Sequence, residues 1–303
     1  MQDGSRVPGA HRVPVPRDAA GERVDRFLAR SLGMSLSRAR DLASEGRVRV
    51  RGKTCSPLRR LSGGEELEVR LPSPRRGPRS SHEPALPALY DDGDVLVVAK
   101  PAGLPVEPSV PGATSAVGAA SRMGRFDVGG QALPGLAHRL DRGTSGCLLF
   151  ARSDLALAAL RRAFAASQVE KEYLAVVAGD PPGEMALDTP YGREPRDPRR
   201  FTTRVASARR ARLSFRVERR FAGAALLRVR LGTGRTHQIR VQLAEQGFPV
   251  LGDDVYGVAS PHIGRQALHA VRLAFPRPSD GQRVVAVAPV PADLEELLRT
   301  LER

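Results

Sequence analysis

The spacing of apolar residues near the start of the chain predicts two helices followed by two strands. The apolar positions of the first helix recur every three or four residues, at Val24, Phe27, Leu28 and Leu32. Ser37 has the side chain of a cap for a second helix, which Gly46 would end. Residues 47–51 and 67–71 alternate strictly between polar and apolar side chains, which is typical of half-buried strands.

The segments on either side of this unit lack apolar periodicity. Residues 1–20 are rich in Pro, Gly and Arg and are predicted to form a flexible tail. Residues 72–86 are predicted to form a linker, because their proline and serine content disfavours regular structure. The pattern therefore divides the chain into a compact module at 21–71 and a second domain at 87–303.

The second domain mixes strands and helices in no regular order. Strands are predicted at 94–99 and 227–231, and helices at 236–246, after Ser153 and from Pro291. Because no steady alternation of strand and helix recurs, the pattern favours the α+β class, with a largely antiparallel mixed sheet flanked by helices. The small module would precede this sheet as an αα-β unit.

The composition of the 303-residue chain points to a polyanionic partner. Lys and Arg number 48 against 33 Asp and Glu, a net charge of +15, which favours nucleic acid. An anionic membrane would also satisfy this charge, but no apolar run is long enough to span a bilayer, and the first residues lack a signal peptide's apolar core. Cys55 and Cys147 form no CxxC pair, and we expect both to be reduced thiols in a cytoplasmic protein.

One carboxylate in the second domain is a candidate for chemistry. Asp141 lies between Arg139 and Arg142 in a glycine-punctuated turn that precedes an apolar strand. Taken alone, an aspartate in a turn is more often a backbone cap or a surface ion pair than a catalytic group. None of the six histidines shows metal-ligand spacing and no phosphate-binding loop is present, so the sequence predicts neither a metal nor a cofactor.

Basic residues gather on the second predicted helix and the strand after it, at Arg38, Arg40, Arg47 and Lys53. Such a run is usually a solvated face. However, the SLSRAR step, the EGRVRVRGK turn and the late GGEELEV strand resemble, in that order, the S4 RNA-binding domain. The resemblance implies that these four residues contact structured RNA through its backbone charge and its shape.

Five segments of the second domain resemble the RluA-type pseudouridine synthases, in the order in which that family carries them. The central segment is HRLDRGTSG, and the others lie at 91–106, 169–179, 231–257 and 266–275. A single match would be weak evidence, whereas five in order are specific and cover nearly all of residues 87–303.

This resemblance implies roles for five residues. Asp141 matches the catalytic aspartate, Arg240 the arginine that pairs with it, and Tyr173 the tyrosine that stacks on the target base. Arg139 matches the arginine that fills the space left by a flipped nucleotide, and Leu268 matches an apolar residue packed beside the tyrosine. The departures from common family choices lie outside this set and bear on the choice of substrate.

The implied reaction breaks the N1–C1′ bond of a uridine, turns the uracil and joins its C5 to C1′. The carboxylate can attack the sugar carbon or remove a proton from C2′, and the residues do not decide between these routes. No atoms are gained or lost, so the reaction requires no cofactor. The layout favours ribosomal RNA as substrate, and transfer RNA stays open. The alternatives are a non-catalytic RNA-binding protein and a nucleoside hydrolase that releases uracil; no protein partner is implied.

Overall fold

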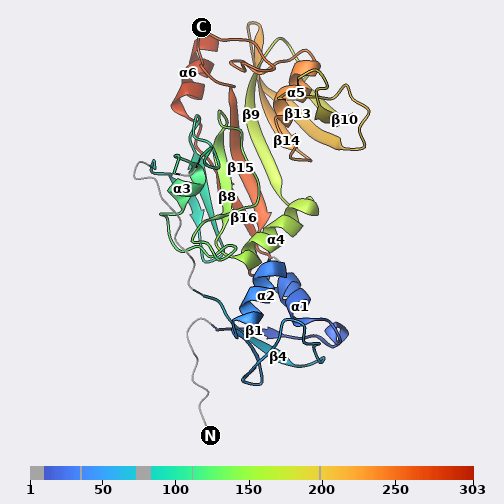
Figure 1. Ribbon diagram of the computed structural model, residues 1–303. Coiled ribbons are helices and arrows are strands. Elements are labelled where there is room, and N and C mark those ends of the chain that lie inside the picture. Colours follow the sequence, from blue (N-terminus) through green and yellow to red (C-terminus); the bar gives the residue numbers. More distant parts are fainter. Residues whose placement is uncertain (1–9, 35, 73–82, 111, 198) are drawn as a thin grey trace.

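The computed structural model describes residues 10–34, 36–72, 83–110, 112–197 and 199–303. They form two domains, an N-terminal module (residues 10–72) and a larger C-terminal domain (residues 83–303), which meet end to end in Figure 1. Within the described ranges, no helix combines the length and the apolar character needed to cross a bilayer.

The N-terminal module is a four-stranded antiparallel sheet with two helices packed on it. The strands lie in the order β1-β4-β2-β3, with bounds β1 Ala10–Pro14, β4 Glu66–Arg70, β2 Val48–Val50 and β3 Lys53–Thr54. The helices are α1 (Val24–Ser31) and α2 (Leu36–Ser44), preceded by the short 3-10 helix η1 (Arg17–Ala19). One buried core joins Phe27 and Leu28 of α1 to Leu67 and Val69 of β4. The predicted helices and strands of this module are therefore present.

Two expectations for this module are wrong. Residues 10–20 do not belong to a flexible tail, because β1 pairs with β4 and Val15 is buried beside it. The proline-rich sequence concealed this strand, which lies at the sheet edge, where Pro14 can be accommodated. Ser37 lies inside α2 and does not cap it, because the helix already includes Leu36. The rest of the predicted tail (1–9) and most of the predicted linker (73–82) lie outside the described residues.

The C-terminal domain is built on a ten-stranded sheet. Eight strands follow the order β10-β13-β14-β9-β15-β8-β6-β5, with β16 paired to β15 and β7 to β8. Their bounds are β5 Ala88–Asp91, β6 Val95–Lys100, β7 Gly135–Leu136, β8 Ser145–Ala151, β9 Glu170–Ala178, β10 Glu184–Pro190, β13 Arg210–Phe221, β14 Ala224–Leu231, β15 Leu268–Pro276 and β16 Arg283–Val287. Among the pairings of these described strands, β15 with β8 is parallel and the rest are antiparallel. The α+β class with a largely antiparallel mixed sheet is confirmed.

Helices and a small ribbon flank this sheet. They are α3 (Ala116–Ala120), α4 (Asp154–Ala165), α5 (Gln238–Glu245), α6 (Ala292–Leu301) and the two-stranded ribbon of β11 (Gly192–Arg193) and β12 (Phe201–Thr202). Leu96 and Val98 of β6 join one buried cluster, whereas Val95 and Val97 join another that includes α4. Because β6 is buried on both faces, its residues 95–99 are all apolar. As predicted, the Ser153 hydroxyl caps α4, by accepting a hydrogen bond from a backbone amide of its first turn.

A partly buried group of charges joins the two domains where α1 and α2 meet α4 (Figure 1). Arg38 of α2 donates to the Asp127 carboxylate at 3.0 Å and also pairs with Asp154, at the start of α4. Its side chain is 11% exposed. Gly33, in the turn between α1 and α2, lies so close to α4 that an added Cβ would overlap Ala158. Carboxylates that only the tertiary fold places around it thus occupy the Arg38 guanidinium, which gives this residue a structural role, and its contact with RNA stays a prediction.

Replacing Arg38 with Met should loosen this contact between the domains. The change leaves Asp127 and Asp154 without their counter-charge. Breaking a fully buried ion pair costs about 3–5 kcal/mol, and we expect a smaller loss here because these carboxylates are partly exposed. We expect faster amide hydrogen exchange around Gly33 and in the first turn of α4. Arg40→Met is the control, because Arg40 pairs with Asp25 inside its own module and its side chain is 50% exposed. Equal exchange rates in the wild type and Arg38→Met would contradict the prediction.

Candidate active site

The fold brings Asp141, Tyr173 and Arg240 together from three separate elements. Asp141 lies in the turn before β8, Tyr173 is on β9, and Arg240 is on α5. The strands β8 and β9 lie on either side of β15, so Tyr173 and the turn that precedes β8 are close in space. Arg240 Nη1 donates to Asp141 Oδ2 at 3.2 Å across 99 positions of sequence. The predicted pairing of these two residues is therefore present.

A second carboxylate holds Arg240 in place. Its Nε and Nη2 atoms both donate to Asp253, each at 2.7 Å, which is the bidentate geometry that orients a guanidinium most firmly. The side chains of Arg240 and Asp253 are 5% and 0% exposed, whereas that of Asp141 is 24% exposed. Asp141 is thus the solvent-facing end of a buried chain of charges.

Burial and pairing act in opposite directions on these groups. Burial by itself would lower the pKa of Arg240, but its hydrogen bond and charge pairing with Asp253, followed by attraction to Asp141, raise that pKa. Burial would raise the pKa of Asp253, whereas Arg240 and two backbone amides bring that pKa below its usual value. Both groups are charged at neutral pH, so a permanent positive charge faces Asp141.

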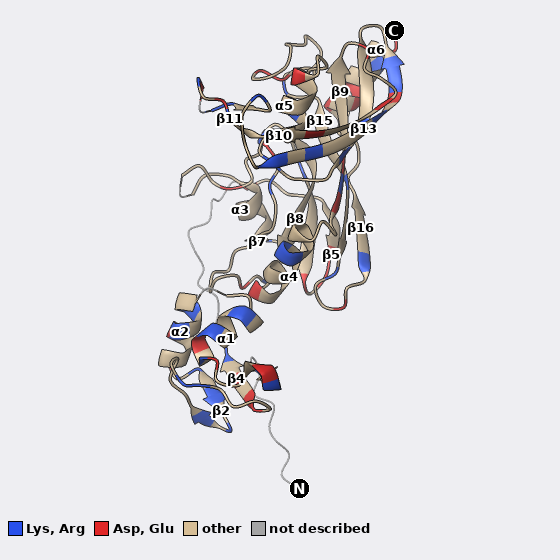
Figure 2. Cartoon of the chain, turned by 90° about the vertical axis from the view of Figure 1, so that its right-hand side faces the viewer, with Lys and Arg blue, Asp and Glu red and all other residues tan. Residues whose placement is uncertain are grey.

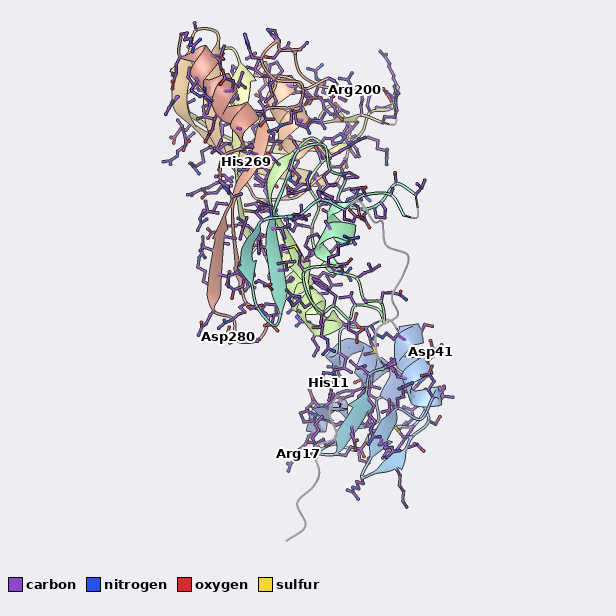
Figure 3. All side chains as sticks on the ribbon, turned by 90° about the vertical axis from the view of Figure 1, so that its left-hand side faces the viewer. His11, Arg17, Asp41, Arg200, His269 and Asp280 are labelled. Atoms are coloured by element: carbon purple, nitrogen blue, oxygen red, sulfur yellow. The ribbon has the colours of Figure 1, made fainter. Side chains whose placement is uncertain are left out.

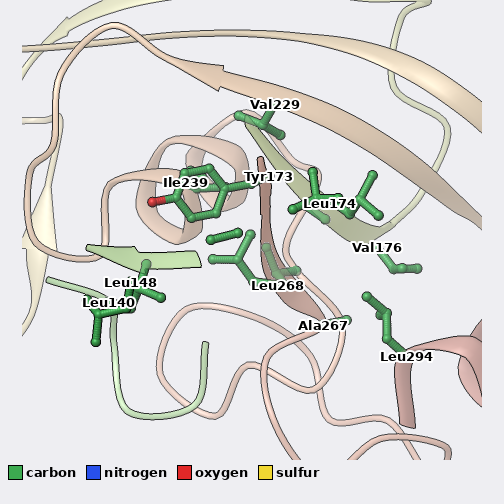
Figure 4. Close-up of a cluster of buried hydrophobic side chains, with 14 of the residues drawn as sticks. Leu140, Leu148, Tyr173, Leu174, Val176, Val229, Ile239, Ala267, Leu268 and Leu294 are labelled. Atoms are coloured by element: carbon green, nitrogen blue, oxygen red, sulfur yellow. The ribbon is translucent and has the colours of Figure 1, made fainter. Parts of the chain in front are cut away.

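Tyr173 and Leu268 pack together beside this pair. The two side chains belong to one buried cluster, and Figure 4 shows the Tyr173 ring next to Leu268 and Ile239. The predicted neighbourhood of tyrosine and leucine is confirmed. Burial first, and the negative charge of Asp141 second, raise the pKa of Tyr173. Its phenol is therefore neutral and presents an uncharged ring close to the Asp141 carboxylate.

His237 is a second polar neighbour of Asp141. Its Nε2 lies 4.0 Å from Asp141 Oδ1, and its Nδ1 lies 3.0 Å from the Tyr256 hydroxyl. Burial lowers the pKa of His237, although Asp141 acts against this shift, so the ring is neutral at pH 7. From the sequence we expect His237 to be a structural member of its motif, and no role is predicted for Tyr256 or Asp253. His237 directly precedes α5, with a left-handed backbone (φ 57°), and its one available signal was its place three residues before Arg240 in the same motif.

Lys100 anchors the turn that carries Asp141. Its side chain is buried, and Nζ donates to the carbonyl oxygens of Pro101 and Leu104 at 2.8 Å and of Arg142 at 3.0 Å. Burial first, and Arg265 second, lower the pKa of Lys100 to about 7, against the attraction of Asp141. A single ammonium therefore ties the end of β6 to the residue directly after Asp141.

Replacing Lys100 with Met should weaken this anchor. It leaves three carbonyl groups without their donor, at a cost of about 1–3 kcal/mol in the free energy of unfolding. Because the pKa of Lys100 is lowered, the unfolded chain binds more protons than the folded one between about pH 7 and 10. The stability of the wild type relative to Lys100→Met should therefore rise with pH in that window. Denaturant titrations at several pH values measure this trend, with the exposed Lys53→Met as control.

The other predicted site residues are spread over both domains. The Arg139 side chain is 73% exposed and lies 3.7 Å from Glu107, two positions before Asp141. In the N-terminal module Arg40 pairs with Asp25, Arg47 pairs with Glu45, and Lys53 is exposed on β3. RNA contacts by these four residues stay predictions. Both cysteines are free, buried thiols. In the part of the chain that the structure describes, no His, Cys, Asp and Glu side chains group as metal ligands would.

Comparison with known proteins identifies the family of the chain. Residues 94–245 match the RNA pseudouridylate synthase family. The chain is 40% identical, over 95% of its length and 97% of the relative's, to an uncharacterized RNA pseudouridine synthase of Mycobacterium bovis. It is 36% identical to ribosomal large subunit pseudouridine synthase D of Xanthomonas campestris, over 99% of this chain and 96% of that one.

A solved structure extends the likeness to the fold. The human RNA pseudouridylate synthase domain containing 4 protein superposes with a TM-score of 0.57 at 23% identity, over 71% of this chain and 92% of that one. At this identity the superposition speaks for the fold alone, whereas the two bacterial relatives extend over nearly the whole chain. The protein therefore belongs to the RNA pseudouridylate synthase family, and it is an RNA pseudouridine synthase, an isomerase.

Proposed function

We propose that this enzyme converts uridines of large-subunit ribosomal RNA to pseudouridine, with Asp141 as its catalytic carboxylate. The observation that carries the residue assignment is the 3.2 Å contact between Asp141 and the buried Arg240. Relatives from Xanthomonas campestris and Neisseria meningitidis bear the name ribosomal large subunit pseudouridine synthase D, at 36% and 33% identity, which supports ribosomal RNA as substrate.

The site supplies what the isomerisation requires. The buried Arg240, held by Asp253, keeps the carboxylate of Asp141 oriented and places a positive charge beside it. An ionised carboxylate at this position can attack C1′ of the ribose or take a proton from C2′. The Tyr173 ring offers an aromatic face to the uracil, and its packing against Leu268 keeps water from the detached base. The exposed Arg139 fills the gap in the RNA after the uridine flips out.

The N-terminal module serves as an S4-type docking domain in this proposal. Its basic residues Arg40, Arg47 and Lys53 would contact the backbone of a structured RNA, which adds affinity without reading sequence. The contact made by Arg38 holds the module at one position relative to Asp141. The distance between docking surface and active site would then help to select the uridine.

Two substitutions of Tyr173 distinguish the contribution of its ring from that of its hydroxyl. Tyr173→Phe keeps the aromatic face and should change the KM for RNA by less than about threefold. Tyr173→Leu removes a face worth about 1–3 kcal/mol per stacked base, which corresponds to a KM about 5- to 150-fold higher. Steady-state kinetics on an RNA transcript measure both variants. A larger loss in Tyr173→Phe than in Tyr173→Leu would show that the hydroxyl, and not the ring, is the functional group.

The substrate assignment is tested by mapping pseudouridines in cellular RNA with and without the gene. We expect specific pseudouridines of large-subunit ribosomal RNA to disappear and to return when the wild-type gene, but not Asp141→Asn, is supplied. Loss confined to transfer RNA would contradict the ribosomal assignment while leaving the enzyme class intact. Release of free uracil from a purified transcript would instead indicate hydrolysis.

A further inference from the structure

A strongly basic segment lies beside the active site. Residues 191–210 contain seven arginines against two carboxylates, a net charge of +5 out of the chain's +15. The segment includes β11 and β12, near which Figure 2 shows basic positions in blue. In Figure 3 Arg200 projects from the side of the domain that faces away from the red helix α6.

A cleft of about 530 Å³ opens between this segment and α5. Arg196, Arg200 and Arg204 line it from the basic segment, and Glu245 and Tyr256 line it from the other side. The helix α5 that forms this wall also carries Arg240. The cleft is therefore built on the same element as the active site.

Tyr256 connects the cleft to Asp141. Its hydroxyl lies 3.0 Å from Nδ1 of His237, whose Nε2 is 4.0 Å from the Asp141 carboxylate. The guanidinium carbons of Arg200 and Arg240 lie 5.1 Å and 5.3 Å from the centre of the Tyr256 ring. A nucleotide next to one held at Asp141 would thus lie within reach of the cleft.

Hydrogen bonds fix the basic segment against α5. The Tyr256 hydroxyl accepts from the Phe201 amide at 2.9 Å, and Glu245 accepts from the Thr202 hydroxyl at 2.6 Å and the Thr203 amide at 3.0 Å. The cleft wall is therefore pinned at three consecutive residues. Because the backbone between Arg200 and Arg204 is already held, less of its conformational entropy is lost when a ligand binds.

The charge balance of the cleft favours an anion. Of the carboxylates that line it, Glu245 is bonded to the threonines and Asp197 pairs with Arg199, which leaves Glu194. Within the described residues, Arg196, Arg200 and Arg204 have no carboxylate at ion-pair distance, and the three lining guanidiniums are exposed.

The cleft offers charge rather than a stacking surface. Phe201 is already stacked on Tyr191, with ring centres 5.7 Å apart, and the Arg193 guanidinium covers it at 5.2 Å. The Tyr256 ring is covered by guanidiniums as described above. With its aromatic rings occupied, the cleft suits phosphate groups better than a base, since guanidinium binds phosphate through charge-assisted hydrogen bonds.

We propose that this cleft is a second RNA subsite, which binds the phosphodiester backbone of the strand flanking the flipped uridine through Arg196, Arg200 and Arg204. A flipped nucleotide forces its neighbours to leave the active site as single strand, and a fixed basic groove directs that strand. This inference rests on the proposed function, because it assumes that the uridine is held at Asp141.

The test uses the double variant Arg200→Gln/Arg204→Gln in the full-length enzyme. For binding to a short single-stranded RNA with one uridine, the slope of log K against log salt should fall by about 1.4, at about 0.7 per lost phosphate contact. On a ribosomal RNA transcript, the KM should rise at least about tenfold with kcat unchanged. The matched control is Arg299→Gln/Arg303→Gln, which removes the same charge from the α6 end of the chain.

A neutral methylphosphonate in place of each phosphate next to the uridine tests the contact from the RNA side. At one of these positions the methylphosphonate should weaken RNA binding to the wild type. It should not weaken binding to the double variant further, because the methylphosphonate and the arginine substitutions remove the same phosphate–guanidinium interaction. Additive losses at every position, or a salt slope equal to that of the control, would overturn the subsite. A fall in kcat at unchanged KM would also overturn it, by showing that the arginines act on Tyr256. These binding measurements stand even if the wild type modifies no ribosomal transcript, a result that would overturn the substrate proposal alone.

Discussion

The Asp141→Asn enzyme should form pseudouridine at least about 10³-fold more slowly than the wild type, or not at all. Asparagine has nearly the same shape and can still accept a hydrogen bond from Arg240. It cannot carry the negative charge that either route through the ribose requires. The expected loss corresponds to at least about 4 kcal/mol of transition-state stabilisation. Release of tritium from 5-tritiated uridine in a ribosomal RNA transcript measures the rate.

The control for this change is Asp254→Asn. The Asp254 carboxylate lies 3.9 Å from Arg240 Nη2, so Asp254→Asn removes the same charge from the same neighbourhood. Unlike Asp141, the Asp254 side chain is 89% exposed. We expect its rate to stay within about twofold of the wild type, because an exposed ion pair contributes little. RNA binding by Asp141→Asn should be retained. Comparable rates for Asp141→Asn and the wild type would remove Asp141 from the reaction.

The Arg240→Met enzyme should be both unstable and inactive. Loss of the Arg240 guanidinium leaves the fully buried Asp253 without a counter-charge. Breaking a buried ion pair in this way costs about 3–5 kcal/mol in the free energy of unfolding. Activity should fall with it, because Asp141 loses the cation that orients it. Denaturant titration and single-turnover kinetics measure the two effects separately.

A double variant separates the structural effect from the catalytic one. In Arg240→Met/Asp253→Asn both charges are gone, and removing both members of a buried pair is often nearly neutral for stability. We therefore expect most of the lost stability to return while pseudouridine formation stays undetectable. Recovery of activity in the double variant would show that Arg240 serves only to neutralise Asp253.

Elements of both domains show how much structure the local sequence pattern could predict. The apolar run of β6, the serine cap of α4 and the C-terminal helix were all predicted, because each depends on neighbouring residues. The β1 strand was missed, because prolines in an edge strand read as irregular chain when the partner strand is not known. Asp253 was missed for a related reason. Its role depends on its burial beside Arg240, and the sequence around either residue does not show that the two are buried together.

Arg38 has a role that its local pattern could not predict. Its position among other basic residues predicted an RNA contact, whereas its partners in the fold, Asp127 and Asp154, are 89 and 116 positions away. The sequence shows that a side chain is charged and can form ion pairs. The fold determines which oppositely charged group lies close enough to pair with it. Arg40 and Arg47 keep partners inside their own module and remain partly exposed.

By itself, the sequence determined the order of helices and strands, the excess of positive charge and the motifs that hold an aspartate, a tyrosine and an arginine, since these depend on short stretches of chain. The tertiary structure decided that Asp141 meets Arg240, that Asp253 holds that arginine, and that the arginines near residue 200 line a cleft with Tyr256. The physical reason is that such contacts join residues tens of positions apart, and only the packing of the sheet and α5 brings their charges within a few ångströms.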